Sequence, residues 1–417
     1  MKRKIIHGLI VLLGCVMFTG CANRQETAAK SPAVTEENTK EEIQEETEPD
    51  GREESSETPD SWQEQVSALI SDSEEEVLGD LYGDYREEGG EIAFVCDNNI
   101  ADGSYNEAVY RGIRTYALAA GVSFSYYIAD ENLSESYREV IERAVSNDAG
   151  IIVCAGNDFG ESVGSLQGVY PDVSFLLIDC MPTDDAGNET DTADNVYCVL
   201  FREEQSGYLA GYLAVMEGYR SLGFIGGKEV PSVQRYGYGY LQGINDAAEE
   251  LELTDVTVNY WYADTYKPEQ EISDRASRWY SQGTEVIFAC GGLLYESVLE
   301  AAVNEDGLLI GVDVDQSALS ERFVTSAMKD LANAVVISLD NYYAYGGRWS
   351  GEFAGQANLY GAENDCIGIP VINTEWRFKQ VTKDDYYKVY RRIRFGDITV
   401  SDGIDKKPHV SVNVNYE

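Results

Sequence analysis

Histidine is almost absent from this sequence: His7 and His409 are the two in 417 residues. His7 falls in a segment that we expect to be cleaved, and His409 stands among polar residues where we expect it at the surface. The chain also lacks a cysteine pair at metal-binding spacing and a GxxxxGK[ST] phosphate-binding run. Asp313 and Asp315 could act as an acid–base pair, but the two-residue period of a strand already places both on one face. We expect neither an enzyme nor a bound cofactor or metal.

Basic residues are scarce as well. The 31 lysines and arginines face 74 acids, which gives a formal net charge of -43. Nucleic acid and anionic membrane surfaces would be repelled by such a chain. The charge therefore excludes both as electrostatic partners, although it points to no particular ligand.

The N-terminus lacks an apolar run long enough to span a bilayer. The run from Ile5 to Phe18 is too short, and it follows three basic residues at positions 2 to 4, an order typical of a secretory signal. The run ends in FTGC, which resembles a bacterial lipobox, whose cysteine becomes the first mature residue and is diacylated. We predict a signal peptide over 1–20 and a lipid on Cys21, which would hold the protein on the extracytoplasmic face of the cell membrane. A plain signal peptide with an incidental cysteine is the alternative.

The segment after Cys21 lacks aromatic residues. Residues 22 to 60 contain thirteen acids and four bases, with Val34 and Ile43 as the large apolar side chains. Such a segment cannot bury enough surface to offset its ordering entropy, so we predict a disordered acidic tether over 21–60. Residues 61–90 are predicted to form a short helical extension, because apolar residues recur there at helical spacing: Trp62, Val66, Leu69 and Ile70.

Five cysteines lie in or at the ends of strand-like apolar runs: Cys96, Cys154, Cys180, Cys198 and Cys290. Buried free cysteine behaves as a small hydrophobic residue. We predict that these are buried thiols, although an exported protein could also use them in disulfides.

From Glu91 onward, short apolar runs alternate with helix-period segments. The runs are IAFVCD at 92–97, GIIVCAG at 150–156, SFLLID at 174–179, LGFIGG at 222–227, TEVIFACGG at 284–292 and LLIGVDVD at 308–315. Continuous apolar strands joined by helices predict doubly wound α/β structure with parallel sheets. The chain contains too many strand–helix units for one unbroken sheet. We therefore predict two lobes between which the chain crosses several times: residues 91–200 with 324–366, and residues 201–323 with 367–417.

Polar residues, glycines and aromatic residues cluster at the carboxyl ends of these strands, where open α/β sheets bind ligands. Carboxylates accept hydrogen bonds from vicinal hydroxyls, aromatic faces stack on flat rings, and glycine permits close backbone approach. These residue types suit a small molecule with a ring and several hydroxyls.

From about 92 to 370 the chain resembles the basic membrane protein family, which includes the purine nucleoside receptor lipoproteins of ABC transporters. The motifs that carry the resemblance occur in order: DNNIADGSYNE at 97–107, EEQSGYLAGYLA at 203–214, LGFIGGKEVPSV at 222–233, TEVIFACGG at 284–292, IGVDVDQS at 310–317 and VTSAMK at 324–329. The resemblance implies a periplasmic-binding-protein-like type I clamshell and a monomer that delivers a nucleoside-like molecule to an ABC permease.

The resemblance also implies ligand contacts. Asp97 and Asn106 would contact the ligand from the first lobe, and Tyr105 would take the place of a stacking phenylalanine. Tyr266 would be the second aromatic face, while Gly291 would bring backbone close to the ligand. Asp313 would hold ribose hydroxyls, Lys329 would donate a hydrogen bond or balance the carboxylates, and Asp158 and Phe159 are weaker transfers.

Each implied contact has an ordinary alternative. Asp97 and Asp313 could cap the following helices, the tyrosines could pack at an interface, and Lys329 could be a solvated charge. Glu203 and Glu204 are better explained as acids favouring a helix N-terminus than as ligand groups.

The chain departs from the family pattern at both aromatic positions, in the loop containing Asn98 and Asn99, and at Asp264, where glycine is common. The added polar groups leave a sugar or another polar ring compound as an alternative ligand. A ligand-responsive receptor and an adhesion lipoprotein that binds no ligand are the alternative functions.

Overall fold

The computed structural model describes residues 91–97, 100, 103–129 and 134–417. By its contacts the chain divides into residues 1–61 and 62–417, and every described residue belongs to the second unit. The predicted signal peptide, the Cys21 lipid, the acidic tether, the helical extension and the Asn98–Asn99 loop all lie outside the described residues.

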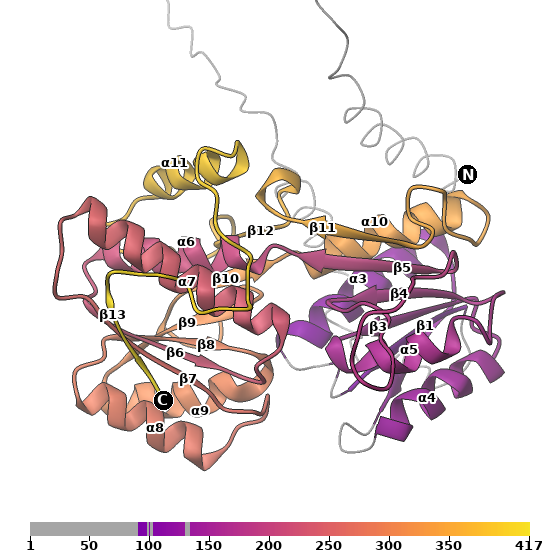
Figure 1. Ribbon diagram of the computed structural model, residues 1–417, viewed down its shortest axis with the longest axis horizontal. Coiled ribbons are helices and arrows are strands. Elements are labelled where there is room, and N and C mark those ends of the chain that lie inside the picture. Colours follow the sequence, from indigo (N-terminus) through magenta and orange to yellow (C-terminus); the bar gives the residue numbers. More distant parts are fainter. Residues whose placement is uncertain (1–90, 98–99, 101–102, 130–133) are drawn as a thin grey trace, which may run out of the picture. The chain divides into compact units, whose positions relative to one another are not determined.

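The first sheet has six parallel strands in the order β11-β5-β4-β3-β1-β2. The strands are β1 (Ile92–Cys96), β2 (Phe124–Ile128), β3 (Ile151–Ala155), β4 (Ser174–Ile178), β5 (Val196–Phe201) and β11 (Gln356–Tyr360). Four helices accompany it: α3 (Tyr105–Ala120), α4 (Ser134–Ser146), α5 (Gly160–Leu166) and α10 (Leu331–Ala344). We call this sheet with its helices lobe 1 (Figure 1).

Both faces of the first sheet are buried over its four inner strands, which explains why β1, β3, β4 and β5 are almost entirely apolar. In β1, Phe94 belongs to the core that includes Ile113 of α3 and Val335 of α10. Val95 belongs instead to the core that includes Ile141 of α4. Successive side chains of a strand alternate between faces, so an inner strand such as β1 contributes apolar side chains to two helical layers.

The second sheet has seven strands in the order β12-β10-β9-β8-β6-β7-β13, of which β12 pairs antiparallel. The strands are β6 (Ser221–Gly226), β7 (Thr257–Tyr262), β8 (Val286–Cys290), β9 (Leu308–Asp313), β10 (Phe323–Lys329), β12 (Ile367–Gly368) and β13 (Asn413–Tyr416). Helices α6 (Glu203–Glu217), α7 (Pro231–Glu250) and α11 (Lys383–Arg394) pack together, and α8 (Gln270–Ser281) and α9 (Tyr295–Glu305) lie on the other face (Figure 1). This is lobe 2. The predicted α/β clamshell class with two mainly parallel sheets is confirmed.

Within the described residues the chain passes between the lobes three times: from β5 to α6, from β10 to α10, and from β11 to β12. The second passage corrects the predicted return at residue 324, because β10 pairs with β9 in the second sheet and the passage follows Lys329. The apolar pattern of β10 identifies a strand but carries no information about which sheet the strand joins. The nine-residue connection from Asp313 to Phe323 favours pairing with the preceding strand.

Helices α6 and α7 approach each other closely because each has glycines four residues apart. A Cβ atom on Gly239 would meet the carbonyl oxygen of Glu204 at 2.0 Å, and one on Gly207 would meet that of Tyr236 at 2.1 Å. The repeated glycines of the SGYLAGYLA and YGYGYLQG segments are therefore a packing requirement. This contact fixes Tyr236 and the N-terminus of α6 beside the site described below.

The six described cysteines, Cys366 among them, are buried and free, in agreement with the prediction for five of them. His409 is exposed, as predicted. Across the described part of the chain, no helix combines the length and the apolar character that a membrane crossing needs.

Candidate ligand-binding site

One cavity is lined by residues from both lobes, and all eight predicted ligand contacts line it: Asp97, Tyr105, Asn106, Asp158, Tyr266, Gly291, Asp313 and Lys329. It contains about 900 Å³ of empty space, part of it open to solvent. Phe159 also lines the cavity, but its ring is fully buried against Tyr137, with centroids 4.8 Å apart, and so belongs mainly to the core of lobe 1.

Lobe 1 contributes the residues that follow its strands. Asp97 follows β1, Asp158 follows β3 in a short 3-10 turn (Asn157–Phe159), and Asp179 follows β4. Asn106, in the first turn of α3, donates from Nδ2 to Asp97 Oδ1 at 3.3 Å. The N-cap of α3 is Ser104, so Asp97 does not have the capping role that was its alternative.

Lobe 2 contributes the ends of β8, β9 and β10. Gly291 follows β8, Asp313 ends β9, and Lys329 ends β10. Asp313 has a φ of 64° and precedes no helix directly, so it caps none. The Tyr236 hydroxyl of α7 donates to Asp313 Oδ1 at 3.2 Å. These contacts fix the Asp313 carboxylate in the cavity wall.

Lys329 is a buried cation surrounded by carboxylates. It pairs with Asp179, and its Nζ lies 3.5 Å from Glu203 Oε1 and 3.6 Å from Asp313 Oδ1. Burial alone lowers the pKa of Lys329, but the negative charges of these acids outweigh it and raise the pKa above its ordinary value. The solvated-charge alternative for Lys329 is therefore wrong.

Aromatic rings complete the surroundings of Lys329. Its ammonium lies 5.0 Å from the ring centroid of Tyr105, 5.5 Å from that of Phe201 and 5.7 Å from that of Tyr236. Rings at this distance attract a cation through their negative faces. The ammonium is thus held by three acids and three rings, and it keeps a fixed place beside the cavity.

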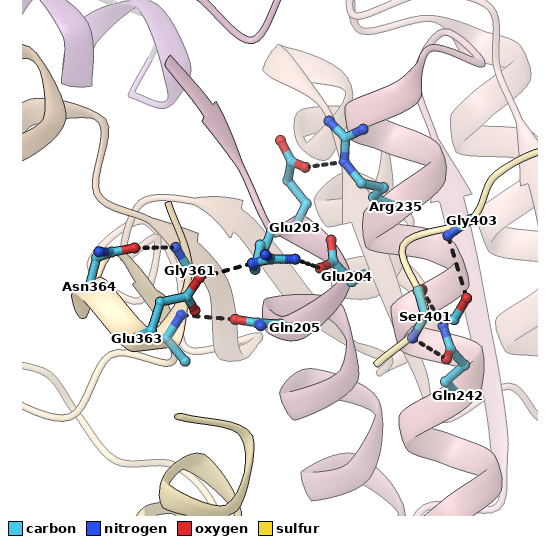
Figure 2. A network of polar contacts seen from close by, with 12 residues as sticks. Glu203, Glu204, Gln205, Arg235, Gln242, Gly361, Glu363, Asn364, Ser401 and Gly403 are labelled. Carbon is cyan, nitrogen blue, oxygen red and sulfur yellow. Dashed lines mark hydrogen bonds and ion pairs between the residues drawn. The ribbon is translucent and has the colours of Figure 1, made fainter. Parts of the chain in front are cut away.

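Burial shifts the pKa values of two of the acids around Lys329 upward, opposite to its effect on the lysine. Burial raises the pKa of Asp313, although Lys329 opposes the shift, and burial raises the pKa of Glu203 against the effect of Arg235. Arg235 Nε lies 2.6 Å from Glu203 Oε2 (Figure 2). Two cations, Lys329 and Arg235, therefore neutralise part of the charge of three acids: Asp179, Glu203 and Asp313. These acids keep part of their capacity to accept hydrogen bonds.

Glu203 and Glu204 begin α6, as predicted from the sequence, but both are buried: at most 1% of the surface of each residue is exposed. Glu204 lies next to the first passage between the lobes, with Glu363 and Gln205 nearby (Figure 2). Neither carboxylate oxygen of Glu204 has a hydrogen-bond partner, and Arg202 Nη1 is 3.9 Å away. Burial raises the pKa of Glu204 to about 8, with a further contribution from Glu203.

Of the three tyrosines that line the cavity, the two predicted to contact the ligand, Tyr105 and Tyr266, are held differently. The hydroxyl of Tyr105 donates to the carbonyl oxygen of Ile178 at 3.3 Å, so the group that distinguishes it from phenylalanine is used within lobe 1. Tyr266 lies against glycine backbone. A Cβ atom added to Gly227 would lie 2.4 Å from the Tyr266 ring, and one added to Gly291 would lie 2.9 Å from it. Gly291 is therefore required, at least in part, to seat Tyr266. Asp264, just before it, has a φ of 57°, which explains why glycine is favoured there.

Asp158 is engaged by the opposite lobe. Lys228, which follows β6, places its Nζ 3.0 Å from Asp158 Oδ2. The same ammonium lies 5.5 Å from the ring centroid of Tyr266.

Sequence reasoning did not name Asp179, Tyr236 or Lys228, and it assigned Glu203 no part in the site. Asp179 ends the apolar run SFLLID in the same way as Asp97 and Asp313 end theirs, so the signal that found those two was present. Tyr236 lies within a helix among many tyrosines, and nothing in its sequence context marks it.

The described residues contain no group of three or more histidine, cysteine or acidic side chains placed to hold a metal ion. The cation among the acids of the site is Lys329. The arrangement of paired acids, tyrosine rings and glycine backbone suits hydrogen bonding and stacking on a small molecule.

Residues 90–399 match the Bmp family, described as ABC transporter substrate-binding protein PnrA-like. The chain belongs to this family. It is thus an ABC transporter substrate-binding protein, and the substrate-binding proteins of this family are extracytoplasmic.

Relatives and solved structures agree with the assignment. Basic membrane protein B of Borreliella burgdorferi is 29% identical over 283 residues, which cover 67% of this chain and 79% of that protein. An ABC transporter solute-binding protein from Aeropyrum pernix K1 has a TM-score of 0.64 at 20% identity and covers 75% of this chain and 94% of its own. One from Conexibacter woesei has a TM-score of 0.58 at 19% identity, with 75% and 98% covered. At these identities the two structures support the fold alone.

Proposed function

We propose that this protein is a lipid-anchored receptor that captures a nucleoside-like molecule between its lobes and delivers it to an ABC permease. The observation that carries the proposal is the cavity, in which Asp97, Asn106 and Tyr105 of lobe 1 and Asp313 and Tyr266 of lobe 2 line one space. Cys21 carries the lipid, and the receptor acts as a monomer.

The residue types divide the recognition between ring and sugar. Tyr105 and Tyr266 offer aromatic rings to a planar base, and base stacking contributes about 1–3 kcal/mol per ring. Asp313 accepts hydrogen bonds from sugar hydroxyls, with Lys329 fixed beside it as a donor or counter-charge. Asp97 and Asn106 bind the polar edge of the base, Gly291 brings backbone to the ligand, and Asp158 contributes at the rim.

The charges of the site favour an uncharged ligand. Asp97, Asp158, Asp179 and Asp313 line the cavity, whereas Lys329 is the lysine among the lining residues and is committed to its acid partners. A phosphate group would meet several carboxylates at short range, where the effective dielectric constant is low. A nucleoside therefore suits the cavity better than its phosphate ester.

A thermal-shift screen of the mature chain carrying Cys21→Ala tests the ligand assignment. The compounds are nucleosides, their free bases, their monophosphates, pentoses and hexoses, and calorimetry confirms each hit. A ligand that binds only the folded state raises the melting temperature. Binding of a nucleoside that is lost in Asp313→Ala supports the proposal, a response to hexoses alone replaces the ligand, and silence from all compounds overturns the nucleoside assignment.

The lipid anchor is tested separately by expressing the full chain and Cys21→Ala in a bacterium supplied with labelled palmitate. Label in the membrane fraction of the unsubstituted chain, and none in the variant, is the expected result. Label in neither chain would contradict the anchor without affecting the ligand assignment.

A further inference from the structure

Two ion pairs cross between the lobes beside the cavity. Lys329 of lobe 2 pairs with Asp179 of lobe 1, and Lys228 of lobe 2 pairs with Asp158 of lobe 1. The first pair is buried. In the second, the side chains of Lys228 and Asp158 keep 30% and 35% of their surface exposed.

Strand order shows that the two pairs lie at different distances from the passages between the lobes. Lys329 ends β10, from which the chain passes into lobe 1, and Asp179 follows β4, the neighbour of the passage strand β5. Asp158 follows β3, two strands from β5, and Lys228 follows β6, three strands from β10. Neighbouring strands lie about 4.8 Å apart, so the Lys228–Asp158 pair lies roughly 10–14 Å from the passage strands.

This difference determines what each pair does when the lobes part. A rotation about the passages moves atoms in proportion to their distance from them. Lys329 and Asp179 remain near the axis, whereas Lys228 and Asp158 separate early. The outer pair is thus the one whose formation reports closure of the cavity.

The backbone next to Lys228 is held in place, and the Lys228 side chain makes a second contact within the site. The amide of the preceding Gly227 donates to the carbonyl oxygen of Cys290 at 2.9 Å, which fixes the backbone next to Gly291. The ammonium then reaches both Asp158 and the ring of Tyr266. One side chain joins an acid of lobe 1 to an aromatic residue of lobe 2.

We infer that Lys228 is a positioning residue that fastens the mouth of the cavity: it holds Asp158 of lobe 1 and the Tyr266 ring of lobe 2 together over the bound molecule and thereby sets the rate of ligand release. The inference rests on the proposed function, since release presupposes a ligand in this cavity. The pair forms when the lobes close and is absent from the open form that the ligand enters, so the association rate of the open form does not depend on it. Both partners are partly exposed, so salt weakens the pair.

The experiment compares Lys228→Met, Lys228→Arg, Asp158→Asn and the double variant Lys228→Met/Asp158→Asn in the mature chain carrying Cys21→Ala. Lys388→Met is the matched control, because Lys388 pairs with Asp385 within α11 and lies outside the cavity lining. Stopped-flow measurement gives the association and release rates of the nucleoside found by the thermal-shift screen, at low and high salt. X-ray scattering gives the radius of gyration with and without the nucleoside.

Release should be about three to five times faster in Lys228→Met, the range expected for a partly exposed ion pair, with the association rate unchanged. Lys228→Arg should restore slow release, and the double variant should release no faster than Asp158→Asn, which already loses both the ion pair and the contact of Asp158 at the rim. Release from the unsubstituted chain should quicken with salt, and release from Lys228→Met should not. A release rate in Lys228→Met equal to that of Lys388→Met, or additive effects in the double variant, would overturn the inference.

Failure of the proposed function gives a different result. If no nucleoside binds the unsubstituted chain, the ligand assignment fails and scattering of the unliganded proteins decides the inference about Lys228. A larger radius of gyration in Lys228→Met than in Lys388→Met supports a fastening role for the pair. Equal radii overturn it.

Discussion

Asp179 and Asp313 occupy corresponding places in the two lobes. Each stands at the carboxyl end of a buried strand, each has a left-handed backbone, with φ of 62° and 64°, and each contacts the ammonium of Lys329. Asparagine and aspartate tolerate this conformation better than most residues. The two lobes thus present matching carboxylates to one lysine, and this pairing sets the charge of the cavity.

Asp313→Asn should weaken nucleoside binding about tenfold or more with little change in the fold. Asparagine keeps the left-handed backbone and the shape of the side chain, but it removes the charge that strengthens hydrogen bonds from sugar hydroxyls. Calorimetry of the variant and of the unsubstituted chain measures the change.

Asp306→Asn is the matched control for this prediction. Asp306 also has a left-handed backbone, with φ of 58°, and lies in lobe 2 at the end of α9, outside the cavity lining. Equal affinity losses in the two variants would show that Asp313 acts through the fold and not through the ligand.

Lys329→Met should lower the free energy of unfolding by about 3–5 kcal/mol near neutral pH, because removing one member of a buried charged group leaves its partners uncompensated. Asp313 and Glu203 already have raised pKa values through burial, and loss of the lysine raises them further. Urea denaturation measures the difference between variant and unsubstituted chain.

The pH dependence identifies the cause of that loss. Acids whose folded pKa lies above the unfolded value, about 4, destabilise the fold above that pH and cease to do so once protonated. The difference between Lys329→Met and the unsubstituted chain should therefore shrink as the pH falls toward 4. A difference that stays constant with pH would indicate lost packing instead of uncompensated charge.

The carboxyl ends of strands made much of the site predictable. Asp97, Gly291 and Asp313 each end an apolar run, and the family resemblance added Tyr266 and Lys329, which line the same cavity. Sheet membership was less predictable. Strand β10 has the same apolar pattern as any buried strand, so periodicity does not show which sheet it joins, and the short connection from β9 was the available signal for its place.

The ion pairs between buried or distant charged residues were the other feature that could not be predicted from the sequence. Glu203 has the position of an ordinary helix N-terminal acid, and only the packing of α6 against α7 buries it beside Arg235 and Lys329. Lys228 belongs to a surface-like KE dipeptide, and its partner Asp158 is 70 residues away in the other lobe. Contacts of this kind follow from the tertiary fold.

Glu204→Gln should raise the free energy of unfolding by about 1–2 kcal/mol at pH 8–9, because it replaces a buried carboxylate without hydrogen-bond partners by a neutral group. The folded pKa of Glu204 is about 8, whereas the unfolded value is about 4.3. The acid therefore costs stability progressively as the pH rises from about 4 to about 8. Denaturation curves across this range should diverge with pH, and Glu161→Gln, on the exposed side of α5, should show no such divergence.

Gly239→Ala should destabilise the fold by about 1–3 kcal/mol through overpacking, even though alanine favours helix more than glycine does. The added Cβ would lie 2.0 Å from the carbonyl oxygen of Glu204, and a backbone atom cannot move aside as a flexible side chain can. Gly168→Ala is the control, because no atom lies within 4 Å of its Cβ position. The separation of α6 from α7 would also shift Glu204 and Tyr236, so ligand affinity should fall along with the urea midpoint in Gly239→Ala and remain unchanged in Gly168→Ala. A stabilised Gly239→Ala variant would mean that helix propensity outweighs the close contact and that the two helices have room to part.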